Sequence, residues 1–185
     1  MTRPAVYRAL VVSIVLLMPA GHASAQSVRF EQPILVTSAG QSADVTIAGM
    51  LFKKAGLPAR VVAQAKPADL DGQKTLVLVP GFSSKGMGSA GIDKDQEMAR
   101  VMSLIGAAQS ANVKILVLHI GGKARRGTQS DSFNRAAATA ASHLVVVRAG
   151  DEDQFFTKLA GEKKISIDVV DRISDATEPV GKLFK

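Results

Sequence analysis

Short runs of apolar, mostly β-branched residues recur along the chain, separated by stretches in which apolar residues follow helical spacing. Six runs predict β-strands over residues 33–37, 59–63, 75–79, 113–120, 143–147 and 165–170. Several runs are apolar at every position instead of at alternate positions. This pattern is typical of parallel strands that helices cover on both faces.

The segments between these runs predict helices. A first helix follows Ser42, a good N-cap, and ends at Gly56 and Pro58. Asp93 and Gln96 have the spacing of a capping box. The helix that they begin runs to about residue 111, and its apolar stripe comprises Met98, Val101, Met102, Ile105 and Ala108. Further helices are expected over about 131–141, from about 151, and over about 179–184.

Alternation of strands and helices with right-handed crossovers predicts an α/β fold with a doubly wound, mostly parallel sheet of five to six strands. The expected arrangement is flavodoxin-like or Rossmann-like, with strand order 2-1-3-4-5 and the sixth strand at an edge. The chain shows no internal repeat, so we expect a single α/β domain over residues 26–185.

The first 25 residues predict a cleaved signal peptide. Arg3 and Arg8 give a positive start, residues 9–17 are apolar, and residues 23–25 form a small-x-small cleavage pattern. The apolar run is short for a membrane span. We therefore expect a periplasmic or secreted protein without a membrane span after cleavage.

Composition excludes several kinds of site. The chain has no cysteine, which rules out a disulfide scaffold, a thiolate metal site, a cysteine nucleophile and a lipid anchor on cysteine. It has no tryptophan, and its one tyrosine, Tyr7, lies in the predicted signal peptide. The net charge of +7 is modest, and nucleic-acid binding is disfavoured without aromatic platforms.

In a doubly wound sheet, ligands bind beyond the carboxyl ends of the strands, where the strand order reverses. Three turns are expected at this edge. The first follows strand one and offers Ser38, Gly40, Gln41 and Ser42 just before a helix. A purely structural turn is the alternative for this segment.

The second turn, residues 80–91, is about twice the usual length of a strand-to-helix loop. Its hydroxyls and its ammonium group, from Ser83, Ser84 and Lys85, suit a carboxylate or a phosphate. It matches neither a Walker A loop nor a G-x-S-x-G elbow. The alternative is a solvated flap.

The third turn, residues 119–131, contains Gly121, Gly122, Arg125 and Arg126 ahead of a helix. Cations at a helix N-terminus oppose the helix dipole, and a bound anion would resolve that conflict. The alternative is that Asp131 neutralises the arginines within the protein.

His119 ends the fourth predicted strand at the same edge and is a weak candidate for acid–base catalysis. No second ligand residue stands near it at metal-binding spacing, so no metal is expected. His143 begins the fifth strand at the opposite edge, where a structural role is expected.

The motifs SAGQS, SSKGMGSAGID and HIGGKARRGTQSD, in this order, resemble a family of exported bacterial proteins of unknown function. The resemblance covers nearly all of residues 26–185 and implies export and an α/β fold. It implies no catalytic residues. The fold is also similar to that of flavodoxin, but no flavin or other cofactor is expected, because the mature chain lacks tryptophan and tyrosine.

These observations favour an exported protein that binds a small anionic ligand at the rim of the sheet, with an accessory role in transport or sensing as one option. They favour a binding protein over an enzyme but leave open whether any reaction is catalysed. One alternative is a hydrolase or transferase that uses His119 with Ser83 or Ser84 on an anionic or acyl substrate. Another is a non-catalytic envelope adaptor that docks an acidic partner. The sequence names neither the ligand nor a transporter or envelope partner.

Overall fold

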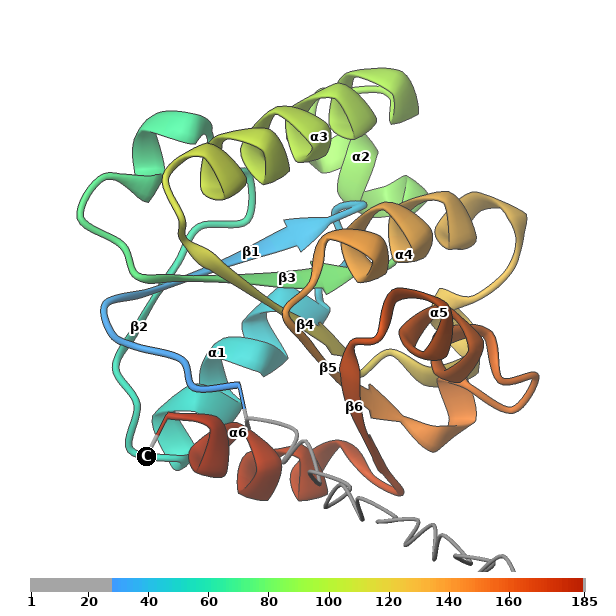
Figure 1. Ribbon diagram of the computed structural model, residues 1–185. Helices are drawn as coiled ribbons and strands as arrows, with labels where there is room; N and C mark the ends of the chain where they lie inside the picture. Colours follow the sequence, from blue (N-terminus) through green and yellow to red (C-terminus); the bar gives the residue numbers. More distant parts are fainter. Residues whose placement is uncertain (1–27, 185) are drawn as a thin grey trace, which may run out of the picture.

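The computed structural model describes residues 28–184, so the predicted signal peptide lies outside the described residues. Within this range, one sheet of six parallel strands forms the centre of the protein (Figure 1). The strands are β1 (Ile34–Ala39), β2 (Ala59–Val61), β3 (Thr75–Pro80), β4 (Lys114–His119), β5 (His143–Val147) and β6 (Ser166–Val170). Their order, β2-β1-β3-β4-β5-β6, confirms the predicted doubly wound sheet.

Residues 28–184 also form six α-helices and four 3₁₀ turns, which connect the strands or, for the last of each, follow β6. The helices are α1 (Asp44–Lys54), α2 (Ser84–Ala90), α3 (Lys94–Ser110), α4 (Thr128–Ala140), α5 (Phe155–Lys163) and α6 (Thr177–Leu183). The 3₁₀ turns are η1 (Pro67–Leu70), η2 (Gly122–Arg125), η3 (Arg148–Gly150) and η4 (Ile173–Ala176). None of these helices combines the length and apolar character that crossing a bilayer requires.

Helices cover both faces of the sheet. α1 and α6 lie on one face, and α3, α4 and α5 lie on the other (Figure 1). Leu76 and Leu78 of β3 pack toward α3 and α4, whereas Val77 and Val79 pack toward α1. Both sets are fully buried, which explains why the strand sequences are apolar at every position.

The capping box of α3 forms as predicted. The backbone N–H of Gln96 donates to Asp93 Oδ1 over 2.8 Å, and that of Asp93 donates to Gln96 Oε1 over 3.0 Å. The predicted apolar stripe is wrong at Met102, which is 51% exposed. The buried side of α3 instead runs through Glu97, Val101, Leu104, Ile105 and Ala108.

The segment predicted as a long loop, residues 80–91, contains the helix α2. Ser83 caps this helix, since its Oγ accepts the backbone N–H of Gly86 over 3.1 Å. Met87 is buried against the core and anchors α2 to the same face as α3. Tertiary packing therefore stabilises a helix whose serine and glycine content disfavours one.

Three helices begin away from their predicted starts. α1 begins at Asp44, and Ser42 Oγ accepts the Asp44 N–H over 3.1 Å just outside the helix. α4 begins at Thr128, so Ser130 lies inside it. α5 begins at Phe155, because η3 and a left-handed Gln154 (φ 61°) occupy the preceding residues.

Candidate functional site

The turns after β1, β3 and β4 meet at the carboxyl edge of the sheet. Gln41 forms an antiparallel bridge with Phe82, and the N–H of Ser83 donates to the carbonyl of Gly40 over 2.9 Å. Arg125 donates from Nη1 to the carbonyl of Phe82 over 3.3 Å. The predicted convergence of the three turns at the point where the strand order reverses is therefore present.

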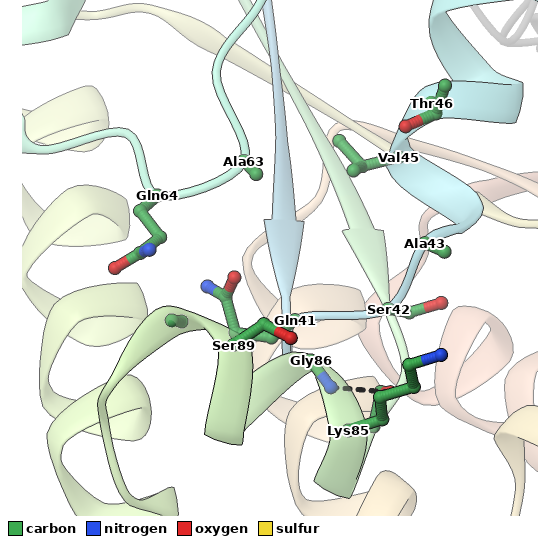
Figure 2. Close-up of a pocket in the computed structure, with 12 residues that line it drawn as sticks. Gln41, Ser42, Ala43, Val45, Thr46, Ala63, Gln64, Lys85, Gly86 and Ser89 are labelled. Atoms are coloured by element: carbon green, nitrogen blue, oxygen red, sulfur yellow. Dashed lines mark hydrogen bonds between the residues drawn. The ribbon is translucent and has the colours of Figure 1, made fainter.

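A hollow of about 460 Å³ lies between the start of α1, the helix α2 and the segment after β2 (Figure 2). We call it the Gln41 hollow. Its lining residues are Gln41, Ser42, Ala43, Val45, Thr46, Ala63, Gln64, Ser83, Lys85, Gly86, Ser89 and Ala90. Four of the predicted ligand-binding residues are among them: Gln41, Ser42, Ser83 and Lys85.

Gln41 is the most constrained polar residue of the hollow. It adopts a left-handed backbone conformation (φ 59°), and its side chain is 8% exposed. Its Nε2 is buried and has no hydrogen-bond partner among residues 28–184. A buried amide donor without an acceptor costs about 1–3 kcal/mol, so an acceptor that reaches Nε2 after a small movement of the side chain would remove this cost.

Ser42, Ser83 and Lys85 also offer donors to the hollow, beside the acceptor oxygens of Gln41 and Gln64. Ser42 Oγ and Ser83 Oγ each accept a backbone N–H, which leaves the proton of each hydroxyl free to be donated. Lys85 is exposed, and no carboxylate of the described residues forms an ion pair with it. Gly86 allows α2 to lie directly on the turn, because a Cβ at this position would overlap the carbonyl oxygen of Gln41.

Arg125 and Arg126 do not line the Gln41 hollow. Arg125 donates from Nε to Asp44 Oδ2 over 3.1 Å and thus pairs with the first residue of α1. Arg126 lies in a second hollow of about 290 Å³, lined by Lys123, Arg126, Gly127, Asp131, Ala149, Glu152 and Asp153.

Every N–H donor of the Arg126 guanidinium already has an acceptor in the protein. Nε and Nη2 donate to Asp131, Nη1 and Nη2 donate to Asp153, and Nη1 also donates to the carbonyl of Gly150. The hydrogen bonds that Arg126 donates to Asp153 and Asp131 raise the pKa of Arg126 above its usual value. The contact with Arg126 also holds the pKa of Asp153 well below the usual value of a carboxyl group. The conflict with the α4 dipole is thus resolved inside the protein, by carboxylates.

His119 ends β4, as predicted, but its ring is completely buried. It packs against Phe156 with ring centroids 4.6 Å apart, and burial lowers its pKa to about 4. Neither ring nitrogen has a hydrogen-bond partner among residues 28–184. A ring with no exposed surface offers no route to a substrate, so the geometry does not favour a hydrolase that uses His119 as its base.

The remaining predicted residues do not line the hollow. Ser38 is buried within β1, and Ser84 is exposed at the start of α2. Gly40 lies directly before Gln41, with its carbonyl bonded to Ser83. Gly121 and Gly122 lead into η2 beside Arg125.

Sequence reasoning missed several residues at this edge. Gln64, Thr46 and Ser89 line the hollow, and nothing local in the sequence marks them. Glu97 and Arg100 of α3 form hydrogen bonds with the backbone at the end of β1 and in the turn that follows it. Glu97 carried a usable signal, because helical spacing places it in line with the buried Val101. No cluster of three or more potential metal-ligating side chains occurs within residues 28–184.

The fold and the position of the hollow define a doubly wound α/β protein with a hollow at the switch point of its parallel sheet. The chain belongs to a family described as a domain of unknown function, DUF6305, which matches residues 31–184. This confirms the resemblance to a family without an assigned function. No match was found among curated proteins.

Similar solved structures are distant. A GDSL-like lipase from Bacteroides thetaiotaomicron VPI-5482 has 10% identity and a TM-score of 0.35, with 74% of this chain and 66% of the lipase covered. AlinE4, an SGNH-hydrolase family esterase, has 12% identity and a TM-score of 0.31, with 85% of this chain and 83% of the esterase covered. The lipase and esterase activities belong to those proteins, and at this distance they are not transferred to this chain.

Proposed function

We propose that this protein binds a small anionic ligand, a carboxylate or a phosphate, in the Gln41 hollow. The observation that carries this proposal is the buried, unpartnered Nε2 of Gln41 in a hollow that also contains Lys85. An oxygen of the ligand would accept from Nε2 and from the hydroxyls of Ser42 and Ser83. Lys85 would neutralise the charge of the ligand.

The energetics support an anion over a neutral ligand. The exposed ammonium group of Lys85 contributes up to about 1 kcal/mol when it pairs with a carboxylate. The donors of the hollow come from separate elements, the turn after β1 and the helix α2 (Figure 2). Because these elements are held by the fold, little ordering accompanies binding.

The size and lining of the hollow restrict the ligand. Ala43, Val45, Ala63 and Ala90 supply short apolar surface beside the polar groups. A compact metabolite with one acidic group and a short aliphatic portion fits this lining. Arg125 belongs to the supporting rim in this proposal, and Arg126 is not a ligand contact.

The export of the protein is part of the proposal. Residues 1–25 would act as a signal peptide and be removed, placing the binding protein in the periplasm or outside the cell. Mass spectrometry of the intact protein recovered from the periplasmic fraction should give the mass of a chain that begins at Gln26, with or without cyclisation of that glutamine. Recovery of the intact chain from the cytoplasm would contradict export without touching the binding site.

The binding test measures thermal unfolding with acetate, succinate, citrate and inorganic phosphate at constant ionic strength. A ligand at 100 times its Kd stabilises the folded state by about 2.7 kcal/mol. Lys85→Ala should weaken binding by up to about fivefold, because the lysine is exposed. Gln41→Asn, which shortens the amide and tolerates the left-handed backbone, should also weaken it.

Lys123→Ala is the matched control, because it removes an exposed lysine from the second hollow. We expect it to leave the affinity unchanged. Equal stabilisation by all four anions and by chloride would overturn the proposal. A loss of binding in Lys123→Ala, with full binding in Lys85→Ala, would contradict the Gln41 hollow as the binding site and indicate the second hollow instead.

A further inference from the structure

A buried ion pair on the first turns of α3 points at the carboxyl end of β1. Glu97 has no exposed surface, and the Arg100 side chain is 11% exposed. The guanidinium binds both carboxylate oxygens, with Nε to Oε2 and Nη2 to Oε1 both at 2.7 Å. The pair is thus rigid and leaves the remaining donors and acceptors in fixed directions.

Those remaining groups contact two segments of backbone that are far apart in sequence. Glu97 Oε1 accepts the N–H of Gly40 over 2.9 Å. Arg100 donates from Nη2 to the carbonyl of Ser38 over 2.6 Å, and from Nη1 to the carbonyl of Ala65 over 2.7 Å. Gly40 directly precedes Gln41 and Ala65 directly follows Gln64, and both glutamines line the Gln41 hollow.

We infer that Glu97 and Arg100 are positioning residues for the Gln41 hollow, setting the separation between Gln41 and Gln64. For its ligand, this inference rests on the proposed binding function. Glu97 holds the turn that carries Gln41, and Arg100 holds the segment that carries Gln64. Neither charged group lines the hollow itself.

A purely stabilising role is a poor explanation for this pair. Buried ion pairs contribute little net stability, and apolar residues of similar size often replace them without loss. Stability of the segment after β2 also has a separate source. Thr37 Oγ1 donates to the carbonyl of Ala63 over 3.1 Å and accepts the N–H of Ala65 over 3.3 Å. The ion pair adds a link from this segment to the Gln41 turn.

The test compares two double variants that each remove a charge pair. Glu97→Gln with Arg100→Met removes the positioning pair but keeps an oxygen for the N–H of Gly40. Asp131→Asn with Arg126→Met removes a pair at the second hollow and serves as the matched control. Two readouts are recorded: NMR of the ligand-free protein, and titrations with succinate and inorganic phosphate.

In the ligand-free protein, the first double variant should shift the side-chain amide signal of Gln64 and speed hydrogen exchange at Ala65, while the control should change neither. Its affinity for the two probes should fall at least tenfold, and that of the control should stay within twofold. Unchanged Gln64 signals and unchanged exchange at Ala65 would overturn the inference. If the wild type binds neither probe, the binding proposal fails, and the ligand-free spectra still decide the positioning role.

Arg100→Lys keeps the inference testable if the double variant does not fold. A lysine retains the charge beside Glu97 but cannot reach the carbonyls of Ser38 and Ala65 together. We expect the Gln64 signal to shift and the Gln41 signal to stay, because Glu97 still accepts the N–H of Gly40. A shift at Gln41 without one at Gln64 would contradict the assignment of the two residues to separate segments.

Discussion

Arg125 and Asp44 form an ion pair between two turns that are 81 residues apart, with Nε 3.1 Å from Oδ2. Both side chains are largely shielded from water, at 25% and 12% exposure. The pair joins the turn after β4 to the first turn of α1. It therefore holds the turn after β4 against the start of α1, beside the Gln41 hollow.

A double-mutant cycle with Arg125→Met and Asp44→Asn should measure a coupling of about 1 kcal/mol in the free energy of unfolding, because the pair is partly desolvated. Urea denaturation gives the four stabilities. The exposed pair of Lys123 and Glu152, 4.0 Å apart, is the matched control, with an expected coupling near zero. Equal couplings for the two pairs would contradict the structural importance of the Arg125 contact.

Two glycines of α2 should respond oppositely to alanine. A Cβ at Gly86 would overlap the Gln41 carbonyl, whereas one at Gly88 would meet open space. Gly86→Ala should therefore destabilise the protein by about 1–3 kcal/mol. Gly88→Ala should be neutral or stabilise it by up to about 1 kcal/mol, since alanine favours helices. Thermal and urea unfolding of both variants measure the difference, and a stable Gly86→Ala protein would contradict the close approach of α2 to the turn.

The strand order could be predicted because its determinants are local and repeated. Each strand lies on a run rich in apolar residues, and each connection has a length that fits a crossover helix or a short turn. The helix α2 could not be predicted in this way. Its residues are poor helix formers, and the contact of Met87 with the core, which stabilises the helix, depends on the completed fold.

The candidate site was predictable only in part. Gln41 and Lys85 follow neighbouring strands of the sheet, so their meeting at one hollow follows from topology. The role of Arg126 depends on Asp153, which lies on the turn after β5 and is 27 residues away. No local sequence pattern predicts that Asp153 pairs with Arg126. Glu97 is the opposite case, because a carboxylate four residues before Val101 already indicates a charge on the buried side of α3.

The two carboxylate partners of Arg126 should contribute unequally to the free energy of unfolding. Asp131 is 27% exposed, whereas Asp153 is 63% exposed and more fully screened by water. We expect Asp131→Asn to lower the free energy of unfolding by about 1–2 kcal/mol and Asp153→Asn to lower it by less than about 1 kcal/mol. Chemical denaturation at neutral pH and at low and high salt measures both. A larger loss of unfolding free energy in Asp153→Asn than in Asp131→Asn would contradict the expectation that the more buried contact contributes more.

His119 should make the folded protein sensitive to mild acid. Burial lowers its pKa from the ordinary 6.5 to about 4, so the folded state keeps the ring neutral while the unfolded chain binds a proton. The stabilising contribution is complete above pH 6.5 and is lost as pH falls toward 4. The difference corresponds to roughly 3 kcal/mol in the free energy of unfolding.

His119→Leu isolates this effect, because leucine fills a similar volume and does not titrate. Urea denaturation between pH 7 and pH 4.5 should show a steep loss of stability for the wild type and a much shallower one for the variant. Contacts that lower carboxylate pKa values, such as that of Arg126 with Asp153, lose their contribution to stability at lower pH. They therefore add little to the pH dependence of stability between pH 7 and pH 4.5. The same slope in both proteins would mean that His119 is protonated in the folded state and that its ring is not as enclosed as its packing against Phe156 indicates.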